Sequence, residues 1–243
     1  MPKERIQKLL ADAGIASRRQ GEELVLEGRV SVNGRVVVAL PCFVVADQDE
    51  VRVDGQIIRL KPSRRLLVLV NKPAGVSCAF RAEGDRPSVF DMVPPSRPPL
   101  HCATPLNTSE AGLVLLTNDG QLAQELSHPR YRLEKTYYVE VNGRMAPPAM
   151  EALKRGVKFG RWRTEGASVR IIRRQTERTV LEIRIAEAKS GELRRILSGA
   201  GHKPVRLRRT AIGPLSDRGV KVGTARRLND SEAKALREAI WRR

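Results

Sequence analysis

The chain has 243 residues, 41% of them hydrophobic, which suits one large domain or a small domain joined to a medium one. No apolar run is long enough to span a membrane, and the charged N-terminus is not typical of a signal peptide, so we expect a cytoplasmic protein without a membrane anchor. Its three cysteines, Cys42, Cys78 and Cys102, fit neither a disulfide framework nor a zinc site and are expected to be reduced core thiols.

The formal net charge is +18, and it is distributed unevenly. Residues 1–60 hold 9 Lys and Arg against 9 Asp and Glu, whereas residues 61–243 hold 36 against 18. A basic excess of this size favours a polyanionic partner, with nucleic acid first among the candidates. The alternative is a basic surface that serves only solubility.

The N-terminal residues predict two short helices followed by a small sheet. Apolar residues recur at helical spacing over 5–15, where Gly14 ends the helix. Ser17 is placed as the N-cap of a second helix that Gly28 ends. Two alternating runs then flank Asn33-Gly34, a strong hairpin signal.

This order of elements, together with the run ASRRQGEELVLEGRVSVNGRVV, resembles an S4 RNA-binding domain over residues 4 to about 60. The resemblance implies that basic residues of the first helices contact RNA backbone, without reading its sequence. The matching residues are Arg5, Lys8, Arg18, Arg19 and Arg29. The alternative is that these are solvated charges balanced by nearby glutamates. We expect an S4 domain at 1–60 and a linker at 61–65.

A second domain is expected at 66–243, centred on the stretch ATPLNTSEAGLVLLTNDG. The apolar run from Leu113 to Leu116, closed by Asn118-Asp119-Gly120, predicts a buried strand that ends in a tight turn. The polar residues before it form a loop that this strand would hold in place. Such loops commonly carry active-site groups.

The same stretch resembles the signature of the ribosomal RNA pseudouridine synthases of the small- and large-subunit branch. That signature contains Gly-Arg-Leu-Asp followed, after a short spacer, by Gly-Leu-Leu-Leu-Leu-Thr-Asn-Asp-Gly. The second half of the signature matches residues 112–120, GLVLLTNDG, at almost every position. In the first half, Thr104, Pro105 and Leu106 replace Gly-Arg-Leu, and Asn107 stands where the family has its essential aspartate.

Further motifs extend the resemblance across nearly the whole chain. NKPAGV at 71–76 resembles the first family motif, and RPSVFDMVP at 86–94 also matches. In Lys-Thr-Tyr, Tyr137 takes the position of the tyrosine that packs on the target uracil, although a strand tyrosine is more often a core residue. Lys189 occupies the basic position that pairs with the aspartate in the family.

The resemblance and the charge pattern also indicate RNA contacts in the second domain. Lys72 is either a phosphate contact or a structural lysine. Residues 203–227 carry eight basic residues against Asp217, the densest candidate phosphate track. The candidate RNA-binding residues here are Lys72, Arg194, Arg195, Arg206, Arg208 and Arg209. The terminal helix is expected to be capped by Asp230 or Ser231.

The resemblance implies an α+β chain, with an S4 domain joined to a domain built on a mixed, mostly antiparallel sheet. It also implies a monomer that acts on ribosomal RNA or a ribosomal subunit precursor. The family's reaction breaks the C1′–N1 bond of uridine, rejoins the ribose to C5, and uses no metal and no cofactor. The aspartate acts as nucleophile or charge stabiliser and is kept ionised by a basic neighbour.

Asparagine has the shape of aspartate but is neutral and a poor nucleophile, so Asn107 is expected to remove the chemistry and keep the fold. Lys189 is then either solvated or paired with another carboxylate, such as Glu110, Glu187 or Glu192. Three hypotheses follow. The first is an inactive homologue that binds ribosomal RNA and acts in ribosome assembly. The second is an active synthase that uses another carboxylate or deamidated Asn107. The third is a binder of a different RNA or of a protein.

Overall fold

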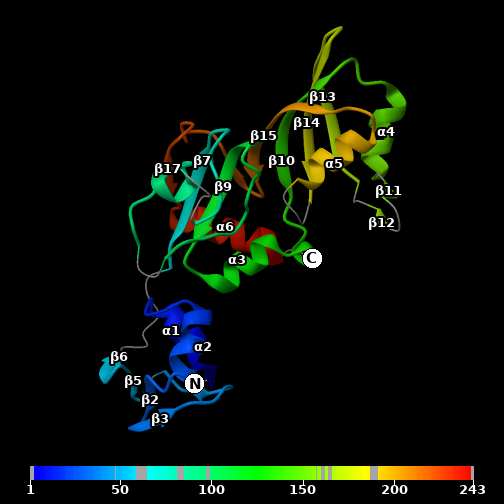
Figure 1. The fold of residues 1–243 in the computed structure, drawn as a ribbon. Coiled ribbons are helices and arrows are strands. Elements are labelled where there is room, and N and C mark those ends of the chain that lie inside the picture. The colour runs from blue at the N-terminus through cyan, green and yellow to red at the C-terminus, as the bar shows by residue number, and fades with distance from the viewer. Residues whose placement is uncertain are drawn as a thin grey trace. The chain divides into compact units, whose positions relative to one another are not determined.

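The computed structural model describes residues 3–46, 48–58, 65–80, 85–96, 99–156, 158–159, 162–163, 166–186 and 191–241. The chain divides into two compact units, which are Met1–Leu66 with Pro95–Leu100, and Leu67–Pro94 with His101–Arg243 (Figure 1). Most of the expected linker, residues 61–64, lies outside the described residues. Within the described ranges, no helix combines the length and the apolar character that crossing a membrane requires.

The first unit packs two helices on a small antiparallel sheet of order β3-β2-β5-β6. Its core joins Ile6, Leu9 and Leu10 of the first helix to Val25 of the second and to the sheet. The elements are α1 (Ile6–Asp12), α2 (Arg18–Leu26), β2 (Val30–Val32), β3 (Arg35–Val37), β5 (Val51–Val53) and β6 (Gln56–Ile58), with β1 (Glu4–Arg5) paired to β4 (Phe43–Val44).

Local signals at the ends of these elements act as the sequence predicts. The Ser17 hydroxyl accepts from the Gln20 backbone N–H at 3.3 Å, and the Gln20 side chain accepts from the Ser17 N–H at 3.0 Å. This reciprocal capping box fixes the start of α2. Asn33 and Gly34 both have positive φ, 50° and 79°, as a two-residue hairpin turn between β2 and β3 requires.

The second unit is built on a mixed, mostly antiparallel sheet of order β13-β14-β10-β15-β9-β7-β17, as expected for an α+β chain. The one parallel pair along this order joins β15 to β9. Its main strands are β7 (Leu67–Lys72), β9 (Ala111–Thr117), β10 (Lys135–Asn142), β13 (Ser168–Arg174), β14 (Arg178–Ile185), β15 (Pro204–Ile212) and β17 (Ala225–Arg227). Shorter pieces are β8 (His101–Cys102), β11 (Lys158–Phe159), β12 (Trp162–Arg163), β16 (Leu215–Ser216), η1 (Val89–Met92) and η2 (Pro129–Tyr131).

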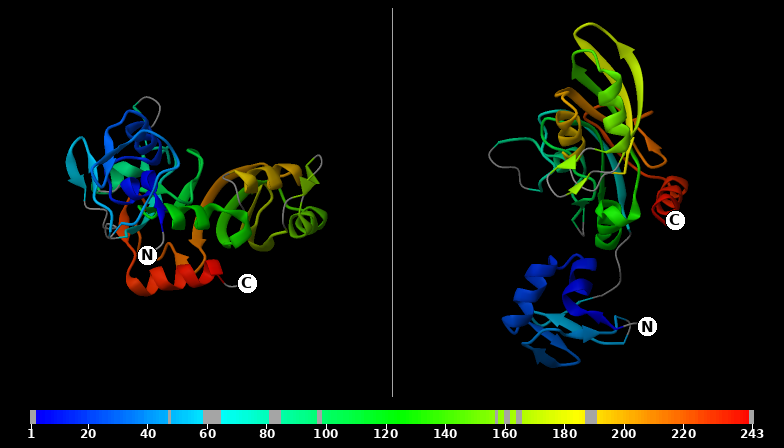
Figure 2. Two further views of the ribbon diagram at one scale, coloured as in Figure 1. Left: turned by 90° about the horizontal axis from the view of Figure 1, so that it is seen from below. Right: turned by 90° about the vertical axis from the view of Figure 1, so that its right-hand side faces the viewer.

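Helices cover the two halves of this sheet differently. The helices α3 (Gly120–Ser127) and α6 (Asp230–Trp241) pack on the β7–β9 half, where Leu122 and Leu236 join a core with Leu69 and Leu115. The helices α4 (Pro147–Arg155) and α5 (Glu192–Gly199) lie at the β10–β14 half, and the β13–β14 hairpin projects beyond it (Figures 1 and 2).

Asn118-Asp119-Gly120 leads from β9 directly into α3, where the Asp119 side chain accepts from the Leu122 N–H and caps the helix. One expectation for a helix end needs correction. The terminal helix is capped by Asn229, not by Asp230 or Ser231. The Asn229 side chain accepts from the Glu232 N–H at 2.8 Å, and the Glu232 carboxylate accepts from the Asn229 N–H at 3.0 Å. The cap was misplaced because several capping residue types stand in a row, from Asn229 to Ser231.

Candidate active site

The polar loop before β9 is fixed where β9 runs parallel to β15. Gly112 pairs with Arg209 and has a φ of 111°, and a Cβ on Gly112 would lie 2.2 Å from the Arg209 carbonyl oxygen. Only glycine allows this approach of the two backbones. The four residues from Leu113 to Leu116 are fully buried, which contributes roughly 1.5–3 kcal/mol each and anchors the loop to the sheet.

Arg209 crosses the interior behind the loop. Its side chain is 1% exposed, and its guanidinium donates to the Leu113 carbonyl at 2.7 Å, to the Thr104 carbonyl, and to the Tyr137 hydroxyl at 3.4 Å. The guanidinium carbon also lies 6.0 Å from the centre of the Tyr137 ring. Arg209 therefore ties the loop, the central strand and the predicted base-contacting tyrosine together. The prediction that it contacts RNA is wrong, because its donors are occupied inside the core.

Lys72 supports the loop from the next strand. It is fully buried, and its ammonium donates to the carbonyls of Val76 at 2.9 Å, Pro73 at 3.1 Å and Thr108 at 3.3 Å. Burial lowers the pKa of this lysine, and the Glu110 carboxylate acts in the opposite direction. The sequence left open whether Lys72 is a phosphate contact or a structural lysine. Its burial and its three backbone carbonyl partners make it a structural lysine, so the assignment as an RNA contact is corrected.

A carboxylate lies directly beneath Asn107. The Glu110 side chain is 2% exposed. One of its oxygens accepts from the Asn107 side-chain amide and the other from the Asn107 backbone N–H, both at 3.1 Å. The Arg194 Nε lies 3.7 Å from the first oxygen. The negative charge of this site thus sits at residue 110, while Asn107 is exposed.

Gly191 closes the other side of the Asn107 amide. It precedes α5 with a φ of 82°, and a Cβ there would lie 2.9 Å from the Asn107 Nδ2. The loop and the start of α5 are therefore held close together, which brings Arg194 to Glu110. The sequence predicted Arg194 only as an RNA contact. Glu110 was named as one possible replacement carboxylate, but its pairing with Arg194 was not foreseen.

Two cysteines flank the loop. The Cys78 sulfur accepts from the Leu106 backbone N–H at 3.4 Å. A hydrogen bond from the Cys102 thiol, the Leu106 N–H and the charges of Lys72 and Arg209 lower the pKa of Cys78 to about 6. Both cysteines are free and only partly buried, so the expectation of core positions is not met for them.

The other predicted site residues fall into three groups. Lys189 and Glu187 lie outside the described residues, and so does the Glu192 side chain. The exposed ones are Arg5, Arg18, Arg19, Arg195 and Arg206. Three more are engaged in ion pairs: Lys8 with Glu4 at 2.7 Å, Arg29 with Asp54 at 2.7 Å and with Glu27 at 3.2 Å, and Arg208 with Asp217 at 2.6 Å.

Residues 66–199 match a family described as RNA pseudouridylate synthase. The chain belongs to that family. Residues 4–38 match the S4 domain. The family match spans Asn107, Tyr137, Gly191 and Arg194, whereas Arg209 lies beyond its end.

Two relatives of this RNA pseudouridylate synthase family member align with it over almost their full length. The chain is 36% identical over 241 residues to an uncharacterized RNA pseudouridine synthase of Aquifex aeolicus, covering 97% of this chain and 94% of that protein. It is 34% identical over 236 residues to ribosomal large subunit pseudouridine synthase B of Bacillus subtilis, covering 96% of each. A crystal structure of a pseudouridylate synthase superposes with a TM-score of 0.68 at 25% identity and covers 96% of this chain and 99% of that chain.

Proposed function

We propose that this protein binds ribosomal RNA through an S4 domain at residues 1–60 and a synthase-like domain at 66–243, and that it does not isomerise uridine. The observation that carries the proposal is the exposed amide of Asn107, which donates to the buried Glu110 carboxylate at 3.1 Å. A neutral amide cannot serve as the nucleophile or balance positive charge on the ribose.

The position of Glu110 supports the loss of chemistry. Its carboxylate is 2% exposed, and Asn107 covers both of its oxygens. To reach a uridine it would have to give up these two bonds and its contact with Arg194, and charged hydrogen bonds of this kind are worth roughly 1.5–3 kcal/mol each. Glu110 therefore serves as the counter-charge of Arg194 that an aspartate at position 107 would otherwise supply.

The choice of RNA rests on the relatives and on charge. The Bacillus subtilis relative is named for the large ribosomal subunit, and this chain covers 96% of it. The whole net charge of +18 belongs to the residues after 60, as phosphate binding would require. We therefore assign ribosomal RNA, or a ribosomal subunit precursor, as the partner.

The test uses the purified full chain and transcribed ribosomal RNA that carries uridine tritiated at C5. Isomerisation releases that tritium, so we expect none above a reaction without protein, together with RNA binding that weakens steeply with salt. The Bacillus subtilis relative serves as the positive control on its own RNA. Stoichiometric tritium release would overturn the proposal of inactivity, and a flat salt response would overturn the assignment of a phosphate-binding surface.

The second candidate is an active synthase in which Glu110 provides the carboxylate. It is favoured by one observation, namely that Glu110 is an acid held at the site and paired with a basic residue, Arg194. In that case Glu110→Gln abolishes tritium release, whereas deamidation of Asn107 would appear as a mass increase of about 1 Da in the loop peptide. These two measurements therefore distinguish catalysis by Glu110 from catalysis by deamidated Asn107.

A further inference from the structure

The large sheet has a second face that does not take part in the loop site. Side chains alternate along β10, so Tyr137 and Tyr138 project to opposite faces. Tyr138 pairs with Arg208 of β15, and Glu140 pairs with Arg206. Tyr138, Arg206 and Arg208 therefore project from the face opposite to Tyr137.

On that face lies a groove of about 830 Å³. It is lined by Tyr138, Arg206 and Arg208, together with Val205 and Val222, which are 49% and 59% exposed. Ser109 and Ala111, the residues on either side of Glu110, also line it. The groove thus adjoins the loop of the active site, and its lining residues all belong to the second unit.

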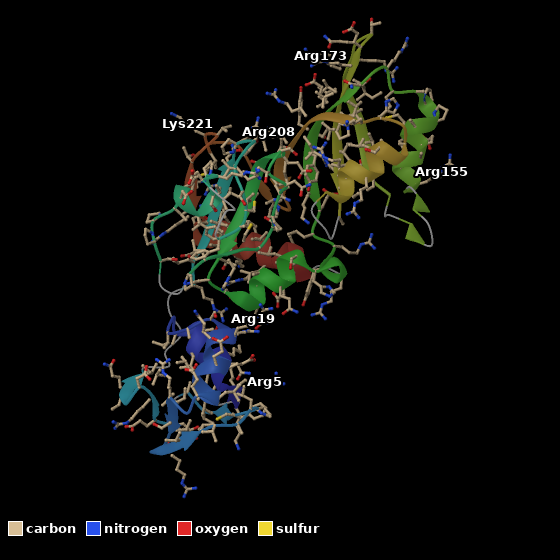
Figure 3. All side chains as sticks on the ribbon, viewed as in Figure 1. Arg5, Arg19, Arg155, Arg173, Arg208 and Lys221 are labelled. Carbon is tan, nitrogen blue, oxygen red and sulfur yellow. The ribbon has the colours of Figure 1, made fainter. Side chains whose placement is uncertain are left out.

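Cationic groups dominate the groove. Arg178, Arg206 and Arg208 line it, against Glu140 as the one lining acid. Arg178 pairs with Glu140 at 2.5 Å and Arg208 with Asp217 at 2.6 Å. Arg206 is exposed, and no acidic group among the described residues lies within ion-pair distance of it. In the view of Figure 3, Arg208 and Lys221, the residue before Val222, lie at the same edge of this unit.

We propose that this groove binds a single-stranded segment of RNA, with a base against Tyr138 and the two valines and phosphates at Arg206 and Arg208. A half-exposed tyrosine on an open sheet, flanked by arginines, is suited to unstacked bases, which single strands present and duplexes do not. The volume suits one or two nucleotides and exceeds what a side chain would fill. The cationic lining complements phosphate and disfavours a basic protein segment.

This inference rests on the RNA binding proposed above but not on the absence of activity. A segment held here passes behind the loop at residues 107–110 while another part of the same RNA faces Asn107. The groove would therefore act as a second anchor that fixes the register of the RNA on the second unit.

The test measures fluorescence anisotropy of a labelled 12-nucleotide oligouridine, and of a 12-base-pair RNA duplex, with the full chain. Arg206→Ala removes an exposed charge without touching the core, and Arg237→Ala, an exposed arginine on α6, is the matched control. We expect Arg206→Ala to weaken oligouridine binding about 3- to 10-fold, and to lower the slope of log affinity against log salt by about 0.7, one single-strand phosphate contact. The control should match wild type, and duplex binding should change less than 2-fold.

Tyr138→Ser probes the base contact. We expect at least a 5-fold loss, the lower end of what stacking of one base contributes, and circular dichroism checks that this half-buried position still folds. A photocrosslink from 4-thiouridine to the Tyr138 peptide would support the proposal independently. The proposal is overturned if Arg206→Ala and Arg237→Ala bind oligouridine with equal affinity while wild type binds it. It is also overturned if an acidic peptide occupies the groove and oligouridine does not. Wild-type protein that binds neither oligouridine nor ribosomal RNA would instead remove the proposed function itself.

Discussion

Replacing Asn107 by aspartate restores the residue type of the family signature. The structure predicts, however, that this change alone destabilises the protein. The Asn107 Nδ2 lies 3.1 Å from a Glu110 oxygen, and the substitution puts a carboxylate oxygen in its place. At that separation two unit charges repel by about 5 kcal/mol at an effective dielectric of about 20, and by about 1 kcal/mol in bulk water. Because Asn107 is exposed and Glu110 is buried, the repulsion falls between these limits.

We therefore expect Asn107→Asp to be about 1–5 kcal/mol less stable than wild type at pH 8, measured by urea unfolding. The deficit should shrink as the pH falls towards 4, because the paired carboxylates then share a proton and no longer repel. The double variant Asn107→Asp with Glu110→Gln removes the repulsion, and its new amide can donate to the carboxylate at position 107. This double variant should recover most of the lost stability.

Tritium release from ribosomal RNA is the matching activity assay. If the remaining site is intact, the double variant should release more tritium than Asn107→Asp, because Arg194 then has the carboxylate at position 107 as its ionic partner. Asn142→Asp, which adds the same charge at an exposed position at the end of β10, is the control and should leave stability unchanged. An Asn107→Asp protein as stable as wild type from pH 5 to 8 would refute the contact between residues 107 and 110.

Three further predictions concern the framework of the site. Gly112→Ala should prevent folding of the second unit, seen as loss of the cooperative unfolding transition, because the new Cβ meets the β15 backbone at 2.2 Å. The Arg226 guanidinium lowers the pKa of Glu232 below the usual 4.5, so the advantage of wild type over Glu232→Gln should be about 0.5–1 kcal/mol above pH 4.5 and should vanish as the pH falls through the lowered pKa. Cys78, whose pKa is lowered to about 6 chiefly by the hydrogen bond from Cys102, should be alkylated by iodoacetamide with a rate that rises between pH 5 and 7; a rise only above pH 8 would contradict this.

Local sequence signals determined the elements of this protein. Hairpin and capping residues act over two to four positions, so Asn33-Gly34 and Ser17 gave their turn and helix start correctly. The apolar run at Leu113–Leu116 likewise predicted a buried strand. The order of motifs indicated the α+β class and the family, because that order is far more specific than any single element. Helix caps failed only where several candidates stood together, as at Asn229 and Asp230.

The tertiary structure decided which charges face solvent and which build the site. Arg209 and Lys72 carry the same charge as Arg206 in the sequence, yet only Arg206 is exposed, since strand register and the parallel pairing of β15 with β9 turn the other two inward. The sequence likewise showed an amide at position 107, but it could not show which carboxylate pairs with Arg194 in its place. That required the approach of Gly191 to the loop, which brings together residues 107, 110 and 194 from distant parts of the chain. Such contacts depend on backbone separations of a few ångströms, and residue types alone do not encode them.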